Sequence, residues 1–145
     1  MAQQGSAMPE HFFFYVGLAF ILTHEMDAIR LKEWNIFPRF LRLPEATAYL
    51  IFTAIHVPLY ILIFWGLIGA AREGWIVGLN SFCIIHVGLH VVFRNHKHNH
   101  FTSVFSWFLI LGAGIAGALD LLFTFCKAHL IDIKISPHNA IRNKP

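Results

Sequence analysis

Long apolar runs alternate with short polar connections along the sequence. The runs extend from about Phe12 to Arg30, from Ala46 to Ala71, from Gly74 to Phe93 and from Thr102 to Cys126. A helix that spans a lipid bilayer needs about 20 mostly apolar residues, and each run is long enough. We therefore predict an all-α fold, an integral membrane four-helix bundle, formed as a single domain by residues 1–145.

The connections differ in character. Leu31–Pro44 is amphipathic, because aromatic and aliphatic residues alternate there with charged ones. This pattern predicts an interfacial segment, with aromatics such as Trp34 in the headgroup region. Arg94–His100 is a short polar loop. We expect a polar tail from Lys127 onward, in which Pro137 ends any helix because proline lacks a backbone donor.

Composition supports a membrane protein and argues against nucleic-acid binding. Hydrophobic residues make up 57% of the chain and charged residues 13%, whereas a soluble domain is about 45–50% apolar. The net charge is only +3, and the basic residues lie mainly in short loops. Such a distribution indicates membrane orientation and the lipid bilayer as a partner.

The basic residues near the helix ends predict the orientation. The end that holds the first and third connections carries more of them than the opposite end, which places it in the cytoplasm by the positive-inside rule. The basic residues on the first end are Arg30, Lys32, Arg39, Arg42, Arg94 and Lys97, and those on the other are Arg72, Lys127 and Lys134.

Histidine and acidic side chains gather at the same end. Counting 1.5 Å per residue from the loops places the deepest histidines at comparable depths, roughly 10–15 Å below them. Ionisable groups inside a membrane are unfavourable, so by default they indicate a functional site. The candidates are His24, Glu25, Asp27, His56, His86, His90, His96, His98 and His100.

Spacing defines an inner group of predicted metal ligands. His86 and His90 are four residues apart and share one face of their helix. His24 and Asp27 are three apart and share a face of another. With His56 on a third helix, they form the kind of constellation found in the cores of helical bundles.

The remaining candidates have more than one interpretation. Glu25 points about 100° away from His24 around the helix, so we assign it to an acid/base or supporting role. His96, His98 and His100 either bind metal above the inner group or are simply solvated.

A divalent cation would balance a carboxylate that otherwise has to protonate in an apolar environment. Nitrogen and carboxylate ligands suit zinc or non-haem iron, and the number of candidates allows one metal or two. Ordinary alternatives stay open. Asp27 could form an ion pair with Arg30, and His56 could be a buried histidine bound to a neighbour.

Two features of the fourth helix lie outside this group. Asp120 is deep in the apolar run, where it could approach His11 across the bundle or pair with Lys127. The spacing Gly112-x-Gly114-x-x-Gly117 indicates close helix packing in lipid, which also allows copies of the chain to form a homo-oligomer.

The segment HEMDAIRLKEW, residues 24–34, resembles small bacterial four-helix membrane proteins with a His-Glu-x-Asp motif, which are mostly uncharacterised. That resemblance implies a bacterial inner membrane location. The pattern of His86-x3-His90 followed by His96-x-His98-x-His100 is distantly similar to the histidine boxes of membrane di-iron desaturases and hydroxylases. Those families also carry a pair of adjacent histidines, which this sequence lacks.

The leading hypothesis is a metal-dependent membrane enzyme that acts on a lipid-like or apolar substrate. The chemistry would be zinc-dependent hydrolysis, with Glu25 as the proton shuttle, or di-iron oxidation. Two alternatives come from other classes: a haem-binding electron-transfer protein with axial histidines, and a conduit for metal ions or protons.

Overall fold

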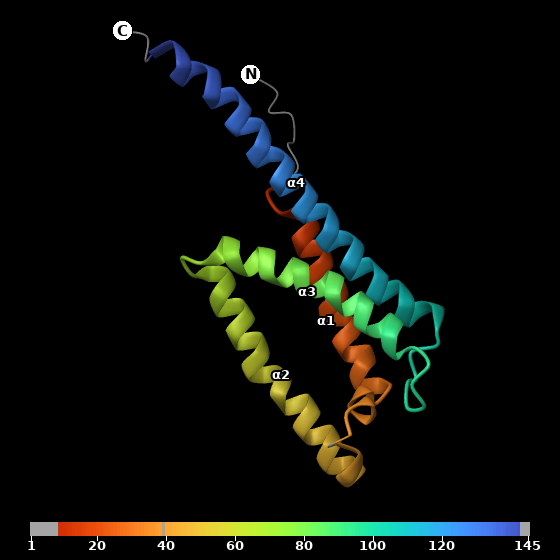
Figure 1. Cartoon of the computed structure of the whole chain (residues 1–145). Coiled ribbons are helices and arrows are strands. Elements are labelled where there is room, and N and C mark those ends of the chain that lie inside the picture. Colours follow the sequence, from red (N-terminus) through yellow and green to blue (C-terminus); the bar gives the residue numbers. More distant parts are fainter. Residues whose placement is uncertain (1–8, 39, 143–145) are drawn as a thin grey trace, which may run out of the picture.

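The computed structural model describes residues 9–38 and 40–142, and within these ranges the protein is all-helical with no strand. Arg39, one of the basic residues counted above, lies outside the described residues. The elements are α1 (Phe12–Arg30), η1 (Glu33–Ile36), η2 (Phe40–Arg42), α2 (Glu45–Ile68), α3 (Arg72–Phe93) and α4 (Val104–Arg142), where η denotes a 3-10 turn (Figure 1).

The predicted four-helix fold is confirmed. Each of the four long helices is long and apolar enough to cross a membrane, with the span in α4 at Val104–His129. This property is compatible with an integral membrane protein.

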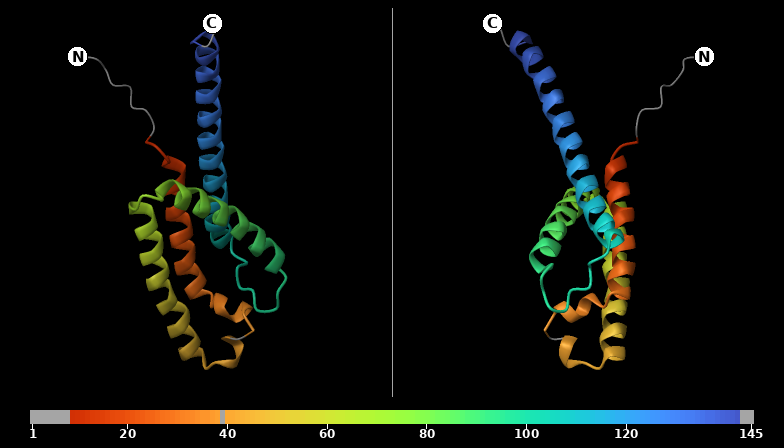
Figure 2. Two further views of the ribbon diagram at one scale, coloured as in Figure 1. Left: turned by 60° about the vertical axis from the view of Figure 1, so that its left-hand side comes forward. Right: turned by 90° about the vertical axis from the view of Figure 1, so that its right-hand side faces the viewer.

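The end of α4 differs from the sequence prediction. The helix continues to Arg142 instead of ending near Cys126 and before Pro137. Lys127 and Ala128 favour helix, and a proline removes only one of the backbone hydrogen bonds that hold a helix together. The distal part of α4 extends beyond the other helices, as both views in Figure 2 show.

Helices α1, α3 and α4 form the packed part of the molecule. α4 runs antiparallel to α1 and makes most of its contacts with α1 and α3. A Cβ atom at Gly117 would lie 2.9 Å from the backbone oxygen of Asn80, so only glycine allows α3 this close to α4. The predicted role of the glycines in close helix packing is thereby confirmed within one chain.

A buried carboxylate holds α1, α3 and α4 together at the end opposite the histidines. Asp120 accepts hydrogen bonds from the backbone N–H of Phe14 at 3.2 Å and from the Asn80 amide at 2.9 Å. Its carboxylate also lies 3.0 Å from Nδ1 of His11. The predicted approach of Asp120 to His11 is confirmed, whereas Lys127 pairs with Glu10 at 3.3 Å.

α2 stands apart from the other helices. It begins near the end of α1, after the connection through η1 and η2, and diverges from α1 toward the α2–α3 hairpin (Figure 1). Its main contacts are with α3. Near the α2–α3 hairpin, the ring of Trp75 occupies the space that a side chain at position 66 would need, so Gly66 admits the ring. α1, α2 and α3 therefore enclose a wedge.

The connection between α1 and α2 folds back into the protein. Lys32 has φ 55°, a left-handed conformation that reverses the chain just after α1 and starts η1. Trp34, which we expected in the headgroup region, is 2% exposed and packs against Tyr49 and Phe52 at centroid distances of 6.1 and 5.4 Å. A large aromatic ring buries more apolar area between these rings than at an interface.

Candidate metal centre

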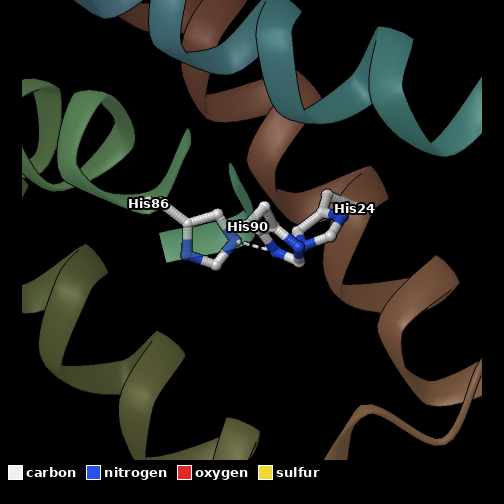
Figure 3. Close-up of side chains that lie close together, drawn as sticks. All are labelled: His24, His86 and His90. Atoms are coloured by element: carbon white, nitrogen blue, oxygen red, sulfur yellow. Dashed lines mark hydrogen bonds between the residues drawn. The ribbon is translucent and has the colours of Figure 1, made fainter. Parts of the chain in front are cut away.

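Three histidines converge where α1 meets the second half of α3. His24 comes from α1, and His86 and His90 come from adjacent turns of α3 (Figure 3). One nitrogen of each lies within 4.8 Å of the others, and Nε2 of His86 and Nε2 of His90 are 3.1 Å apart. Two nitrogens bound to one tetrahedral zinc at about 2.0–2.1 Å lie about 3.4 Å apart, so small side-chain movements would complete such a site.

His24 is buried without any hydrogen-bond partner. Its side chain is 0% exposed, and neither ring nitrogen has a partner within the described part of the chain. A neutral imidazole carries one donor and one acceptor, and leaving a buried polar group unpaired costs about 1–3 kcal/mol. A cation at this position would bind the acceptor nitrogen and remove part of that penalty.

Phe101 packs against two of the three histidines. It lies in the α3–α4 connection, is 2% exposed, and its ring centroid is 5.3 Å from that of His24 and 4.8 Å from that of His90. The aromatic ring excludes water from one side of the site. An apolar shell of this kind strengthens the interaction between a cation and its ligands.

A carboxylate from η1 lies beside this group. Oε1 of Glu33 is 3.7 Å from Nε2 of His90, and only 14% of the Glu33 side chain is exposed. Burial and, second, the neighbouring Glu25 carboxylate raise the pKa of Glu33 from 4.5 to about 8. Glu33 thus supplies an acidic group at the site, together with the three imidazoles.

Asp27, the predicted carboxylate ligand, has other partners. Its Oδ1 accepts hydrogen bonds from Nε and Nη2 of Arg30 at 2.9 and 2.7 Å. Its Oδ2 accepts one from Ser106 of α4 at 2.6 Å. The ion pair with Arg30 considered from the sequence is therefore present, but with a carboxylate that is only 4% exposed.

His56 and Glu25 form a separate pair. Nδ1 of His56 donates to the Phe52 carbonyl at 2.7 Å, which leaves Nε2 facing Oε2 of Glu25 at 2.9 Å. A proton must lie between these two atoms, on the imidazole or on the carboxyl, because two lone pairs would repel each other. The structure therefore places His56 with Glu25, apart from the three-histidine group.

The loop histidines also lie outside that group. His96 and His98 face each other with ring centroids 5.7 Å apart, and the backbone N–H of His98 lies 3.4 Å from Nδ1 of His96. His100 is exposed. Among the described residues, His24, His86 and His90 form the one group of three or more side chains with metal-binding geometry.

Sequence reasoning missed two residues of the site, Glu33 and Phe101. Glu33 was grouped with the interfacial residues, and its position depends on the reversal at Lys32, which no helical or alternating pattern reveals. A usable signal exists: Glu33 follows Asp27 by only six residues at the end where the histidines gather. Phe101 is one of 15 phenylalanines, and nothing local distinguishes it.

The fold and the site together define the class of protein to which this chain belongs. This is a small all-α protein whose four long helices are each long and apolar enough to span a membrane, with three histidines, two of them buried, close enough together to hold a metal ion.

Residues 10–127 match a family of unknown function, DUF6713, and the chain belongs to that family. This finding confirms the resemblance to an uncharacterised family. The likeness to histidine-box desaturases is not shown. No curated protein and no solved structure matches the chain.

Proposed function

We propose that this protein is a membrane metalloenzyme that binds one divalent metal ion through His24, His86 and His90. The observation that carries the proposal is the fully buried His24, whose two ring nitrogens have no hydrogen-bond partner in the described part of the chain although two further imidazoles adjoin it. Glu33, whose Oε1 lies 3.7 Å from Nε2 of His90, would hold that ligand in place.

The ligand set favours zinc over a di-iron centre. Three histidines with one open position is a catalytic zinc arrangement, whereas di-iron sites in bundles draw carboxylates from several helices. Asp27 is engaged by Arg30 and Ser106, and Glu25 by His56. The described residues therefore offer few free carboxylates for a second ion.

Glu25 is the proposed acid/base group. It shares a proton with His56 and also lines a cavity of about 560 Å³ between α1, α2 and α3. A zinc ion with an open coordination position activates water or polarises a carbonyl group. Glu25 would accept the proton at its carboxylate, and His56 would hold that carboxylate in place.

The two alternative hypotheses, a haem-binding electron-transfer protein and a conduit for metal ions or protons, have weaker support. A haem would need two imidazoles on opposite faces of a flat macrocycle, but the three rings lie with their centroids 4.6–5.0 Å apart. A conduit would need polar groups across the whole thickness of the membrane. The polar groups instead gather at the two ends, at His24 and at Asp120, with a mainly apolar cavity in the wedge between.

Elemental analysis of the purified protein tests the proposal. We expect about one zinc per chain in the wild type and a loss of most of the metal in His24→Ala and His86→Ala. The matched control is His129→Ala, which removes an exposed histidine of α4 far from the site. Unchanged metal content in both site variants, or no bound metal in the wild type after growth with zinc, refutes the site.

We also propose that the histidine end faces the cytoplasm of a bacterial inner membrane. The support is the excess of basic residues around α1, η2 and the α3–α4 loop. Its test is given below, at the scale of the whole molecule.

A further inference from the structure

The wedge between α1, α2 and α3 holds a cavity with apolar walls. Its volume is about 560 Å³, within the usual range of about 300–1,000 Å³ for small-molecule sites. Leucine, isoleucine and phenylalanine side chains from all three helices line it, among them Leu18, Leu59, Ile63 and Phe82.

The cavity is elongated. Its lining on α1 runs from Phe14 to Glu25, eleven residues at 1.5 Å each, or roughly 16 Å. One end lies at the α2–α3 hairpin, beside Trp75 and Gly78, and the other lies at Glu25 and Tyr60. An extended chain molecule fits this shape better than a compact ring system does.

The polar end of the cavity offers a hydrogen-bond acceptor. Glu25 lines this end, and its Oε2 lies 2.9 Å from Nε2 of His56. The second oxygen of Glu25 accepts no hydrogen bond from the residues that the structure describes. A hydroxyl can donate a hydrogen bond to that oxygen, whereas a fatty-acid carboxylate has no proton to donate. An ammonium group would lose its hydration between the apolar walls, which is unfavourable for a charge.

We propose that this cavity binds a single long-chain aliphatic alcohol, with its hydroxyl group at Glu25 and its chain directed toward Trp75. The inference rests on the proposed function in one respect, because a long-chain alcohol is the product that hydrolysis of a long-chain ester at the metal site would release together with the acid. Binding itself requires only the cavity and the Glu25–His56 pair.

Two glycines of α3 allow a matched test. Gly78 lines the cavity, Gly88 does not, and a Cβ atom at either position meets nothing within 4 Å. Gly78→Leu therefore places a side chain in the cavity, and Gly88→Leu adds the same side chain elsewhere on the helix. Ile63→Trp fills the cavity from α2 and serves as a second blocking variant.

The probe is a bromine-labelled hexadecanol, added to the protein in phosphatidylcholine nanodiscs. Bromine near Trp75 quenches its fluorescence. We expect saturable quenching in the wild type and in Gly88→Leu, weakened at least tenfold in Gly78→Leu and Ile63→Trp. Quenching that is equally strong in all four proteins, or that never saturates in the wild type, overturns the proposal.

Further arms test the headgroup. The methyl ether of the same alcohol lacks the donor, so the wild type should bind it at least fivefold more weakly, and Glu25→Leu should abolish that preference. The labelled fatty acid and amine should also bind more weakly than the alcohol. If the ether or a phospholipid chain binds as tightly as the alcohol, the cavity holds bulk lipid and the proposal fails.

Metal content, measured on the same samples, separates the two proposals. Gly78→Leu should keep the metal of the wild type. Saturable alcohol binding without metal would leave the inference standing and refute the proposed function. Full metal content without alcohol binding would refute the inference and leave the proposed function standing.

Discussion

Individual side chains at the histidine end divide into two kinds. His24, His86 and His90 have geometry for a metal, and His24 has no other partner in the described part of the chain. Asp27 and His56 carry the same chemistry but are engaged by neighbours. Local partners therefore decide which of several chemically suitable residues is available to bind a ligand.

Glu33→Gln should weaken metal binding by about 10- to 100-fold, as loss of a ligand-supporting carboxylate usually does. The Glu33 carboxyl group lies 3.7 Å from Nε2 of His90, and glutamine keeps its size but cannot give up a proton to become an anion beside a bound metal. Competition with a chromophoric chelator measures the affinity. The control is Glu45→Gln, because Glu45 is exposed and pairs with Lys32 away from the histidines. Equal affinities for all three proteins would remove Glu33 from the site.

Asp27→Asn should lower stability while leaving the metal in place. The substitution weakens the ion pair with Arg30 and the 2.6 Å hydrogen bond from Ser106. We expect a loss of about 1–3 kcal/mol, seen as a lower midpoint of thermal unfolding in detergent. Ser106→Ala should act in the same direction. Loss of metal with an unchanged unfolding midpoint would instead make Asp27 a ligand.

At the scale of elements, contacts between helices place the site. α1 and α3 bring the three histidines together, and α4 packs closely against both of these helices. The carboxylate of Asp120 at one end and that of Asp27 at the other connect α4 to its neighbours. Two polar contacts and a row of small residues thus set the relation of α1 to α3.

Gly117→Ala should disturb this arrangement, because its Cβ would lie 2.9 Å from the backbone oxygen of Asn80. Backbone cannot move aside as a flexible side chain can, so we expect a loss of about 1–3 kcal/mol and a lower unfolding midpoint. Gly88→Ala, at a position with open space, should be neutral or stabilising because alanine favours helix. Equal midpoints for the two variants would mean that α3 and α4 are not in close contact at Gly117.

For the whole molecule, the proposed orientation places the α3–α4 loop in the cytoplasm and the α2–α3 hairpin outside. Single cysteines at Lys97 and at Arg72, in a protein freed of Cys83 and Cys126, test this in intact cells. A membrane-impermeant maleimide should label Arg72→Cys and leave Lys97→Cys unlabelled until the cells are opened. The opposite pattern would invert the topology.

The length and apolar character of the helices were evident from the sequence, since spanning a bilayer requires a run of apolar residues that no other fold needs. The boundaries of α1 were predicted as observed, and those of α2 and α3 to within a few residues. The extension of α4 to Arg142 was not predicted. Beyond the membrane span the helix depends on the helix propensities of individual residues, and the polar tail has no apolar pattern that would reveal them.

The sequence by itself determined that there are four apolar helices and that the histidines gather at one end, because periodicity and depth are properties of a single helix. Only the tertiary structure decided which candidates share a site. A chain reversal brings Glu33 close to His90, whereas Arg30 and Ser106 engage the carboxylate of Asp27, and His56 pairs with Glu25. Apart from the Asp27–Arg30 pair, these contacts depend on distances between different segments of the chain, and spacing along one helix carries no information about such distances.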